Sequence, residues 1–195
     1  MILRVGDGDD GKTAALYFCP APGEQEGERI GKSAFSGFLS EAEALLHPDF
    51  ILLDTKGDLG HSFQLAASVA GRAAVIATHH PAAMRGAEKT ASALFDAGVT
   101  PMLIVNLFEP DATDRIKRRF RAGLLEMVDR TGVGLLGVVP AMPDLALGQE
   151  RGLLADRAGK NTLLPFSNIA ARLCGEAVPL FYGMKRRKKL KENAL

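Results

Sequence analysis

The chain of 195 residues has no tryptophan, few aromatic residues and only two cysteines. So few aromatic side chains favour a core of Leu, Val, Ala and Ile. Cys19 and Cys174 are too few and too far apart for a disulfide framework or a cysteine metal site, and we expect reduced thiols in a cytosolic protein. No apolar run approaches the ~20 residues that span a bilayer, and the first residues lack the pattern of a secretory signal peptide.

The charge of the chain is unevenly distributed. The net charge is +1, but six basic residues and one Glu give residues 185–195 a charge of +5, which leaves −4 for the rest. A basic run is typical of a solvated tail, and it also suits an anionic membrane surface at about 1 kcal/mol per basic residue. We assign membrane binding to Lys185, Arg186, Arg187, Lys188 and Lys189. Apolar residues are sparse among them, which predicts electrostatic adhesion, with nucleic acid as a non-specific competitor.

Strand-like and helix-like segments alternate along the chain. Apolar runs predict strands at 16–19, 50–53, 73–78, 102–106 and 135–139. Helical periodicity predicts helices at 34–46, with Ser33 as N-cap, and at 60–70, 81–97, 112–131 and 163–174. Residues 20–32 are predicted to form a surface loop. The alternation predicts an α/β fold, a doubly wound and mostly parallel sheet with helices on both faces. We expect one domain over residues 1–180 and a basic tail over 181–195.

The run Phe50–Leu53 is followed by Asp54. Four consecutive apolar residues suit a strand covered on both faces, and Asp54 then falls at the strand end, where open α/β sheets place their ligands. In nucleotide hydrolases an Asp at this point serves magnesium or the attacking water. An Asp that only turns the chain after a strand is an equally good interpretation.

Six segments, in the right order, resemble the MinD/ParA group of deviant-Walker-A P-loop ATPases. They are a strand ending in Pro-Ala, an Asp-containing strand with its switch, a strand end followed by a helix, a strand ending in Asn, a Gly-Val-Val-Pro strand, and a last helix ending in Gly-Glu-Ala-Val-Pro. They occur at 16–21, 49–57, 78–88, 103–106, 135–140 and 167–179. The resemblance covers roughly residues 15–180 and corresponds to the C-terminal two-thirds of the family's domain, so we expect an N-terminally truncated or divergent member.

The resemblance implies an ATPase that binds ATP and Mg²⁺ and takes part in placing the bacterial division septum. It implies dimerisation, a cell-division regulatory partner, and peripheral attachment to the inner face of the cell membrane. Asp54 would be the catalytic residue, Gly11, Lys12, Thr13 and Asn106 would bind nucleotide, and Thr13 and Asp54 would serve the metal. Thr55, Lys56 and Gly57 would form the switch. Asn106 can pair with the N6 and N7 edge of adenine.

The phosphate-binding segment departs from the family pattern. Residues 6–13 formally match G-x-x-x-x-G-K-[ST], but Asp7, Asp9 and Asp10 bring negative charge to a phosphate site, and Asp7 replaces the signature lysine. The following helix would be short, because Pro20 and Pro22 come soon after Thr13. We prefer to interpret this segment as a Gly/Asp-rich turn and expect weak or absent ATP hydrolysis.

Two other functions are consistent with the sequence. One is a non-catalytic interaction module of the same ancestry that has lost the phosphate loop. The other, which we favour less, is a ParA-like partitioning protein that contacts nucleic acid through its basic tail.

Overall fold

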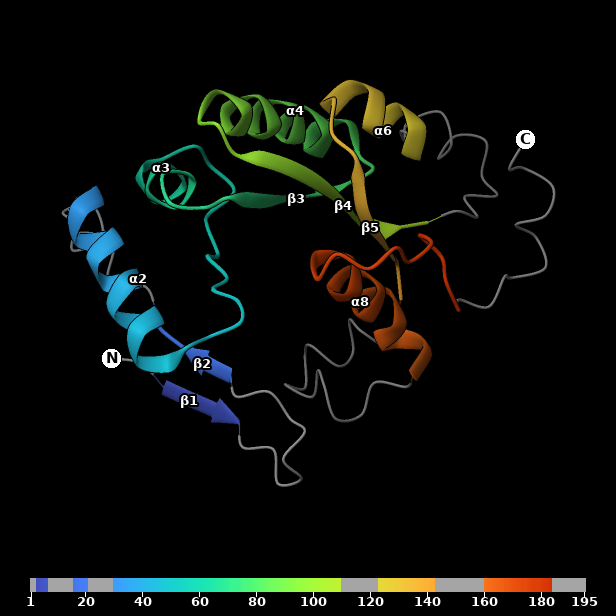
Figure 1. Ribbon diagram of the computed structural model, residues 1–195. Coiled ribbons are helices and arrows are strands. Elements are labelled where there is room, and N and C mark those ends of the chain that lie inside the picture. The colour runs from blue at the N-terminus through green and yellow to red at the C-terminus, as the bar shows by residue number, and fades with distance from the viewer. Residues whose placement is uncertain (1–2, 7–15, 21–29, 110–122, 143–159, 184–195) are drawn as a thin grey trace. The chain divides into compact units, whose positions relative to one another are not determined.

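The computed structural model describes residues 3–6, 16–20, 30–109, 123–142 and 160–183 (Figure 1). Its contacts divide the chain into two compact units, Met1–Val69 and Ala70–Leu195, and each unit is described by itself. Within the described residues, no helix is long and apolar enough to cross a membrane. The boundary predicted at residue 180 remains a prediction.

The first unit begins with a two-stranded antiparallel sheet. Strand β1 (Leu3–Gly6) pairs with β2 (Leu16–Phe18), and the register shifts between Arg4 and Gly6. The strand predicted at 16–19 is therefore present. Its partner is a neighbouring antiparallel strand and not a parallel one, because the two strands are close enough in sequence to form a hairpin.

Two helices complete the first unit. Helix α2 (Lys32–Leu46) begins after Gly31 and not at the predicted cap Ser33, and none of its residues is buried. Its half-buried residues follow the predicted helical face: Phe35, Leu39, Ala42 and Leu46. Helix α3 (His61–Ala67) buries Phe63, Ala66 and Ala67, and His61 Nε2 lies 2.9 Å from the carbonyl oxygen of Ile30.

The strand predicted at 50–53 is wrong. Residues 50–56 have no regular structure, and Phe50, Ile51 and Leu52 are exposed. A strand needs a neighbour that satisfies its backbone N–H and C=O groups. The described strands of this unit, β1 and β2, pair with each other, so apolar composition alone does not make residues 50–53 a strand.

The second unit is built on a three-stranded parallel sheet in the order β3-β4-β5. Strands β3 (Arg72–Thr78), β4 (Thr100–Phe108) and β5 (Leu135–Pro140) lie where the sequence predicted strands. In β4, alternate residues point to opposite faces: Leu103 and Val105 are fully buried, whereas Met102 and Ile104 pack with the cluster on the other face. The parallel α/β prediction is thus confirmed.

Helix α4 (Pro81–Asp96) packs against β3 and β4 through Met84, Ala87, Ala91 and Leu94. Pro81 occupies the first turn, where its missing N–H costs nothing. Gly98, at φ +74°, ends the helix, with the Val99 N–H bonded to the Leu94 carbonyl and the Gly98 N–H to that of Phe95. This is a Schellman motif, so the predicted start and end of the helix are both confirmed.

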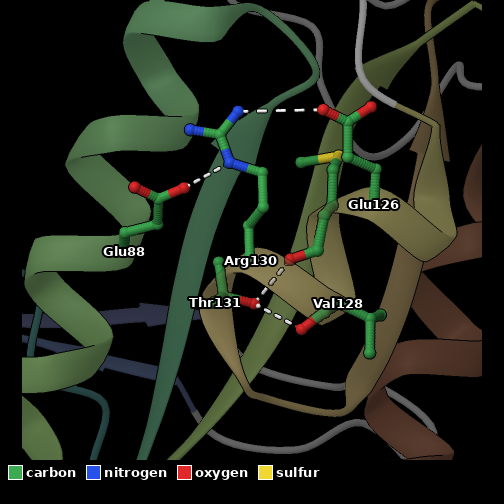
Figure 2. Close-up of polar contacts among 6 residues, drawn as sticks. Glu88, Glu126, Val128, Arg130 and Thr131 are labelled. Atoms are coloured by element: carbon green, nitrogen blue, oxygen red, sulfur yellow. Dashed lines mark hydrogen bonds and ion pairs between the residues drawn. The ribbon is translucent and has the colours of Figure 1, made fainter.

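Helix α6 (Leu124–Thr131) packs beside α4. Figure 2 shows Arg130 between Glu88 of α4 and Glu126 of its own helix. Arg130 Nε donates to Glu88, and Thr131 Oγ1 donates to the carbonyl of Met127 at 2.7 Å. Only the pair with Glu88 connects the two helices, and both ion pairs are partly exposed, so they contribute little to stability. The rest of the helix predicted at 112–131 lies largely outside the described residues.

Helix α8 (Lys160–Leu173) lies on the other face of the sheet, against β5 (Figure 1). Ile169 joins Leu136 and Val139 in a cluster with Met102, Ile104, Met142 and Leu173. A Cβ added to Gly137 would overlap the side chain of Ile169, so only glycine lets the helix approach β5 this closely. Helices therefore cover both faces of the sheet, as predicted.

Candidate functional site

The carboxyl end of the parallel sheet brings several polar and aromatic side chains together. Thr78, the last residue of β3, pairs with Asn106 of β4, and Phe108 of β4 pairs with Pro140 of β5. The Ala141 N–H donates to the Phe108 carbonyl at 2.9 Å, which extends the pairing past β5. Open α/β sheets bind ligands at this end. We call this end of the second unit the carboxyl edge.

Asn106 and Leu107 interrupt strand β4 at the carboxyl edge. The register with β5 shifts between Val105 and Phe108, and Leu107 adopts φ +52°. The Leu107 N–H donates to Asn106 Oδ1 at 2.9 Å, so the asparagine side chain satisfies a backbone group at the kink. A left-handed conformation costs a leucine about 1–2 kcal/mol, and such strain often marks a functional position. Asn106, predicted to end a strand and face a ligand, is thus half-buried at a strained kink.

Three rings lie beside this kink. His79, which follows β3, is buried, and its ring stacks on that of His80 with centroids 5.1 Å apart. The ring of Phe108 meets His79 edge-on at 5.6 Å. In the sequence, His79 and His80 are simply two adjacent histidines that follow the predicted strand at 73–78. The sequence contains one sign that an aromatic ring would lie near these histidines: Phe108 follows Asn106 by two residues, at the end of the neighbouring strand.

The predicted switch residues lie in the first unit, on the exposed segment that leads to α3. Asp54, Lys56 and Gly57 are exposed, and Thr55 is half-buried. Asp58 Oδ1 accepts the Gly60 N–H at 2.9 Å and so shapes the turn before α3. Asp54 and Asn106 belong to different units, and no distance between them is defined. The roles assigned to Asp54 and to the switch therefore stay predictions.

The remaining predicted ligands, Gly11, Lys12, Thr13 and the basic residues 185–189, lie outside the described residues. Among the residues that the structure does describe, no three His, Cys, Asp or Glu side chains are grouped so as to hold a metal ion. The predicted metal pair Thr13 and Asp54 stays a prediction.

Comparison with known proteins identifies relatives by sequence. A candidate septum site-determining protein MinD of Emiliania huxleyi is 32% identical over 133 residues, which cover 67% of this chain and 48% of that protein. The septum site-determining protein MinD of Thermotoga maritima is 24% identical over 85% of this chain and 60% of its own length. The chain is a MinD-like family member. It spans about half the length of these relatives. No protein-family model matches the chain.

Solved MinD structures share the fold of this MinD-like chain. The MinD cell division protein of Aquifex aeolicus superposes with a TM-score of 0.67 at 23% identity, over 77% of this chain and 64% of that one. A MinC:MinD complex of the same organism gives 0.66 at 24% identity, over 77% and 62%. MinD of Pyrococcus horikoshii with Mg-ADP gives 0.60 at 17% identity, over 77% and 60%. At these identities the likeness shows a P-loop NTPase-like α/β fold.

Proposed function

We propose that this MinD-like chain takes part in placing the division site and binds an adenine nucleotide at the carboxyl edge. The observation that carries the proposal is the kink at Asn106 and Leu107, because it holds an asparagine amide at strand β4's end at an energetic cost. The sequence relatives named as MinD supply the biological context.

The carboxyl edge is chemically suited to the base end of a nucleotide. Asn106 Oδ1 accepts one hydrogen bond, from the Leu107 N–H. The side chain keeps a second lone pair on this oxygen and two N–H donors, which can pair with the edge of adenine. The exposed His80 ring, which follows strand β3 at the carboxyl edge and stacks on His79, offers a flat surface for a base to stack on. Residues Asn106 and His80 would therefore bind and orient the base, while the phosphates extend toward other parts of the chain.

The residues that we assign to the phosphates come from the resemblance to the MinD/ParA group. Lys12 with Gly11 and Thr13 would hold the phosphates, and Asp54 with Thr55, Lys56 and Gly57 would sense them. Mg²⁺, when bound, would neutralise phosphate charge. Because the chain's acidic segment around Lys12 opposes phosphate binding, we propose that hydrolysis by this chain is slow.

Three further features belong to the same proposal. The chain would bind a cell-division regulatory partner, as the MinD of the MinC:MinD complex does. It would form a homodimer. It would adhere to an anionic membrane through the basic residues 185–189, whose positive charges attract acidic headgroups.

Calorimetric titration with Mg-ADP and Mg-ATP tests the nucleotide assignment. We expect adenine nucleotides to bind and guanine nucleotides to bind at least about tenfold more weakly, because the Asn106 amide matches only adenine's edge. Asn106→Ala should weaken adenine binding about tenfold or more, since it removes both hydrogen bonds. Thr100→Ala, at the exposed amino end of the same strand β4, serves as the control and should leave the affinity unchanged.

Two outcomes would overturn the proposal. One is the absence of binding to any adenine nucleotide, and the other is equal affinity of the wild-type chain and Asn106→Ala. A Lys12→Ala variant tests the phosphate end separately: if it abolishes tight Mg-ATP binding, residues 6–13 form a working phosphate loop and our turn interpretation is wrong.

A further inference from the structure

The backbone of His80 is fixed at the junction between strand β3 and helix α4. His80 comes directly before Pro81, and a residue before proline is restricted to extended conformations. It has φ −84° and ψ 143°, and the Met84 N–H donates to its carbonyl at 3.0 Å in the first turn of α4. The position of His80 is therefore set by a strand that ends two residues before it and by a helix that begins directly after it.

A row of three rings supports the His80 side chain. The His80 ring stacks on that of His79, with centroids 5.1 Å apart and planes inclined by 18°. His79 is only 2% exposed, and the ring of Phe108 in β4 meets it edge-on at 5.6 Å and 75°. Stacked and edge-on arrangements at these distances are favourable. We call His80, His79 and Phe108 the ring row, in which the His80 ring rests on a buried ring that a neighbouring strand holds in place.

The outermost ring of the row lies at the surface. His80 is exposed, whereas His79 is buried and Phe108 is half-buried. His80 is the N-cap residue of α4, but its side chain makes no capping hydrogen bond. The ring is thus supported on one side by His79 and is not used by the helix start. An exposed ring that is held in this way is a surface on which the flat base of a ligand can stack.

The ring row begins beside the kink that holds Asn106. Thr78, one residue before His79, is the parallel-strand partner of Asn106, and Phe108 follows Asn106 by two residues. Neighbouring strands lie only about 4.8 Å apart. The amide of Asn106 and the ring row therefore come from the same two strand ends, close enough for one base to contact both.

A stacking ring and an amide distinguish bases by different properties. An asparagine amide distinguishes adenine from guanine, because the edges of these bases carry different donors and acceptors. A stacking ring accepts every base, because every base has a flat face. The fused rings of a purine nevertheless bury more apolar area than the single ring of a pyrimidine, so stacking favours purines. The two groups at the carboxyl edge can thus set two separate preferences.

We propose that His80 selects purine over pyrimidine nucleotides at the carboxyl edge, and that His79 and Phe108 are positioning residues that hold its ring. This inference rests on the proposed nucleotide binding and deepens it, because it assigns the two parts of base selectivity to two side chains. Asn106 distinguishes adenine from guanine, and His80 distinguishes both purines from the pyrimidines. Phe108 acts through His79, so it changes the selectivity for ring size without touching the base.

Calorimetric titration of His80→Ala with Mg-ADP, Mg-GDP and Mg-CDP tests this division. We expect the binding of ADP and GDP to weaken about tenfold each and that of CDP about threefold. The ratio of ADP to GDP affinity then stays constant, while the ratio of ADP to CDP affinity falls about threefold. Asn106→Ala should instead lower the ratio of ADP to GDP affinity. Phe95→Ala, at a 52% exposed ring near the other end of α4, is the control and should change neither ratio.

The same titrations separate this proposal from the proposed function. If the wild-type chain binds none of the three nucleotides, the nucleotide site is wrong, and the role of His80 with it. If Asn106→Ala weakens ADP binding while His80→Ala binds all three as the wild type does, the nucleotide site stands and the role of His80 is wrong. Equal losses for ADP and CDP in His80→Ala would overturn the selection by ring size.

Two further substitutions of His80 distinguish stacking from hydrogen bonding. His80→Phe keeps a ring but no N–H group, and we expect it to recover most of the affinity for ADP and GDP. His80→Gln keeps polar groups but no ring, and it should bind as His80→Ala does. Neither substitution removes a helix cap, because the His80 side chain makes none. The reverse pattern would show that His80 contacts the nucleotide by a hydrogen bond and not by stacking.

A tryptophan at residue 80 tests the positioning role of Phe108. The chain has no other tryptophan, so His80→Trp gives a single indole. Its emission should fall when Mg-ADP or Mg-GDP binds, because a stacked base quenches it. In this background Phe108→Leu should lower the indole anisotropy without nucleotide and weaken ADP binding about threefold, since the edge-on ring is lost. Phe108→Tyr keeps the ring and should restore both. Unchanged anisotropy and affinity in Phe108→Leu would show that Phe108 does not position residue 80.

Discussion

Residues 50–53 and strand β3 have similar apolar sequences and different structures. The first segment has no regular structure and exposes Leu52 to 83%, whereas β3 pairs along its length with β4 and buries Val75 and Ala77. The difference lies in their surroundings within each unit. Strand β3 has a parallel neighbour and a covering helix, α4, while residues 50–53 pair with none of the strands described in their unit. An apolar run becomes a strand only where neighbours complete it.

Truncating an apolar side chain in each unit is the strongest test of this comparison. Leu103→Ala should destabilise the protein by about 2–5 kcal/mol, because Leu103 is fully buried and leaves a cavity. Leu52→Ala should change the stability by less than about 0.5 kcal/mol. Urea unfolding followed by circular dichroism measures both. A large loss for Leu52→Ala would mean that residues 50–53 are buried in solution, contrary to the comparison.

A methyl group added at the helix–strand contact should have an intermediate effect. Gly137→Ala would place a Cβ 2.7 Å from Ile169 Cδ1, so Ile169 or α8 must move, at a cost of about 1–3 kcal/mol. Gly134→Ala, where nothing lies within 4 Å of the added Cβ, is the control and should stay within about 0.5 kcal/mol of wild type. Thermal melts of the two variants that coincide would contradict the close packing of α8 on β5.

Relief of backbone strain should give the smallest effect, and a stabilising one. Leu107→Gly removes the cost of a left-handed leucine but adds chain entropy to the unfolded state, for a net gain of about 0.5–1 kcal/mol. Leu107→Ala keeps the strain and should give no gain. In the first unit, His47→Gly is the counterpart, because His47 also has a positive φ, of 44°. Chemical denaturation would refute the strain if Leu107→Gly were no more stable than Leu107→Ala.

Local patterns in the sequence were sufficient for most of the second unit. Alternation within β4, the apolar stripe of α4 and the Pro81 and Gly98 that bound it all lie within a few residues, so their structure could be predicted. Asn106 was predicted to end a strand, whereas β4 continues past it to Phe108. The role of Asn106 toward a nucleotide stays a prediction.

Other features depend on contacts between distant residues. Arg172 bonds to Leu136, 36 residues earlier, and no local pattern announces that bond. The left-handed Leu107 was equally unexpected, because leucine has no preference for that conformation. It lies where the register between β4 and β5 shifts. The wrong prediction of a strand at 50–53 has the opposite cause. The local apolar pattern is strong, but no described strand of the first unit pairs with these residues.

The strap, which we define as residues 174–183 after helix α8, has a kinetic consequence. Its bonds to Asn168 and Arg172 join residues 14 and six positions apart, so closing them orders only a short loop. The strap can therefore detach from α8 and rebind without opening the parallel sheet, as a local unfolding unit of lower stability than the core. Amide hydrogen exchange in residues 178–183 should then be faster than in β4.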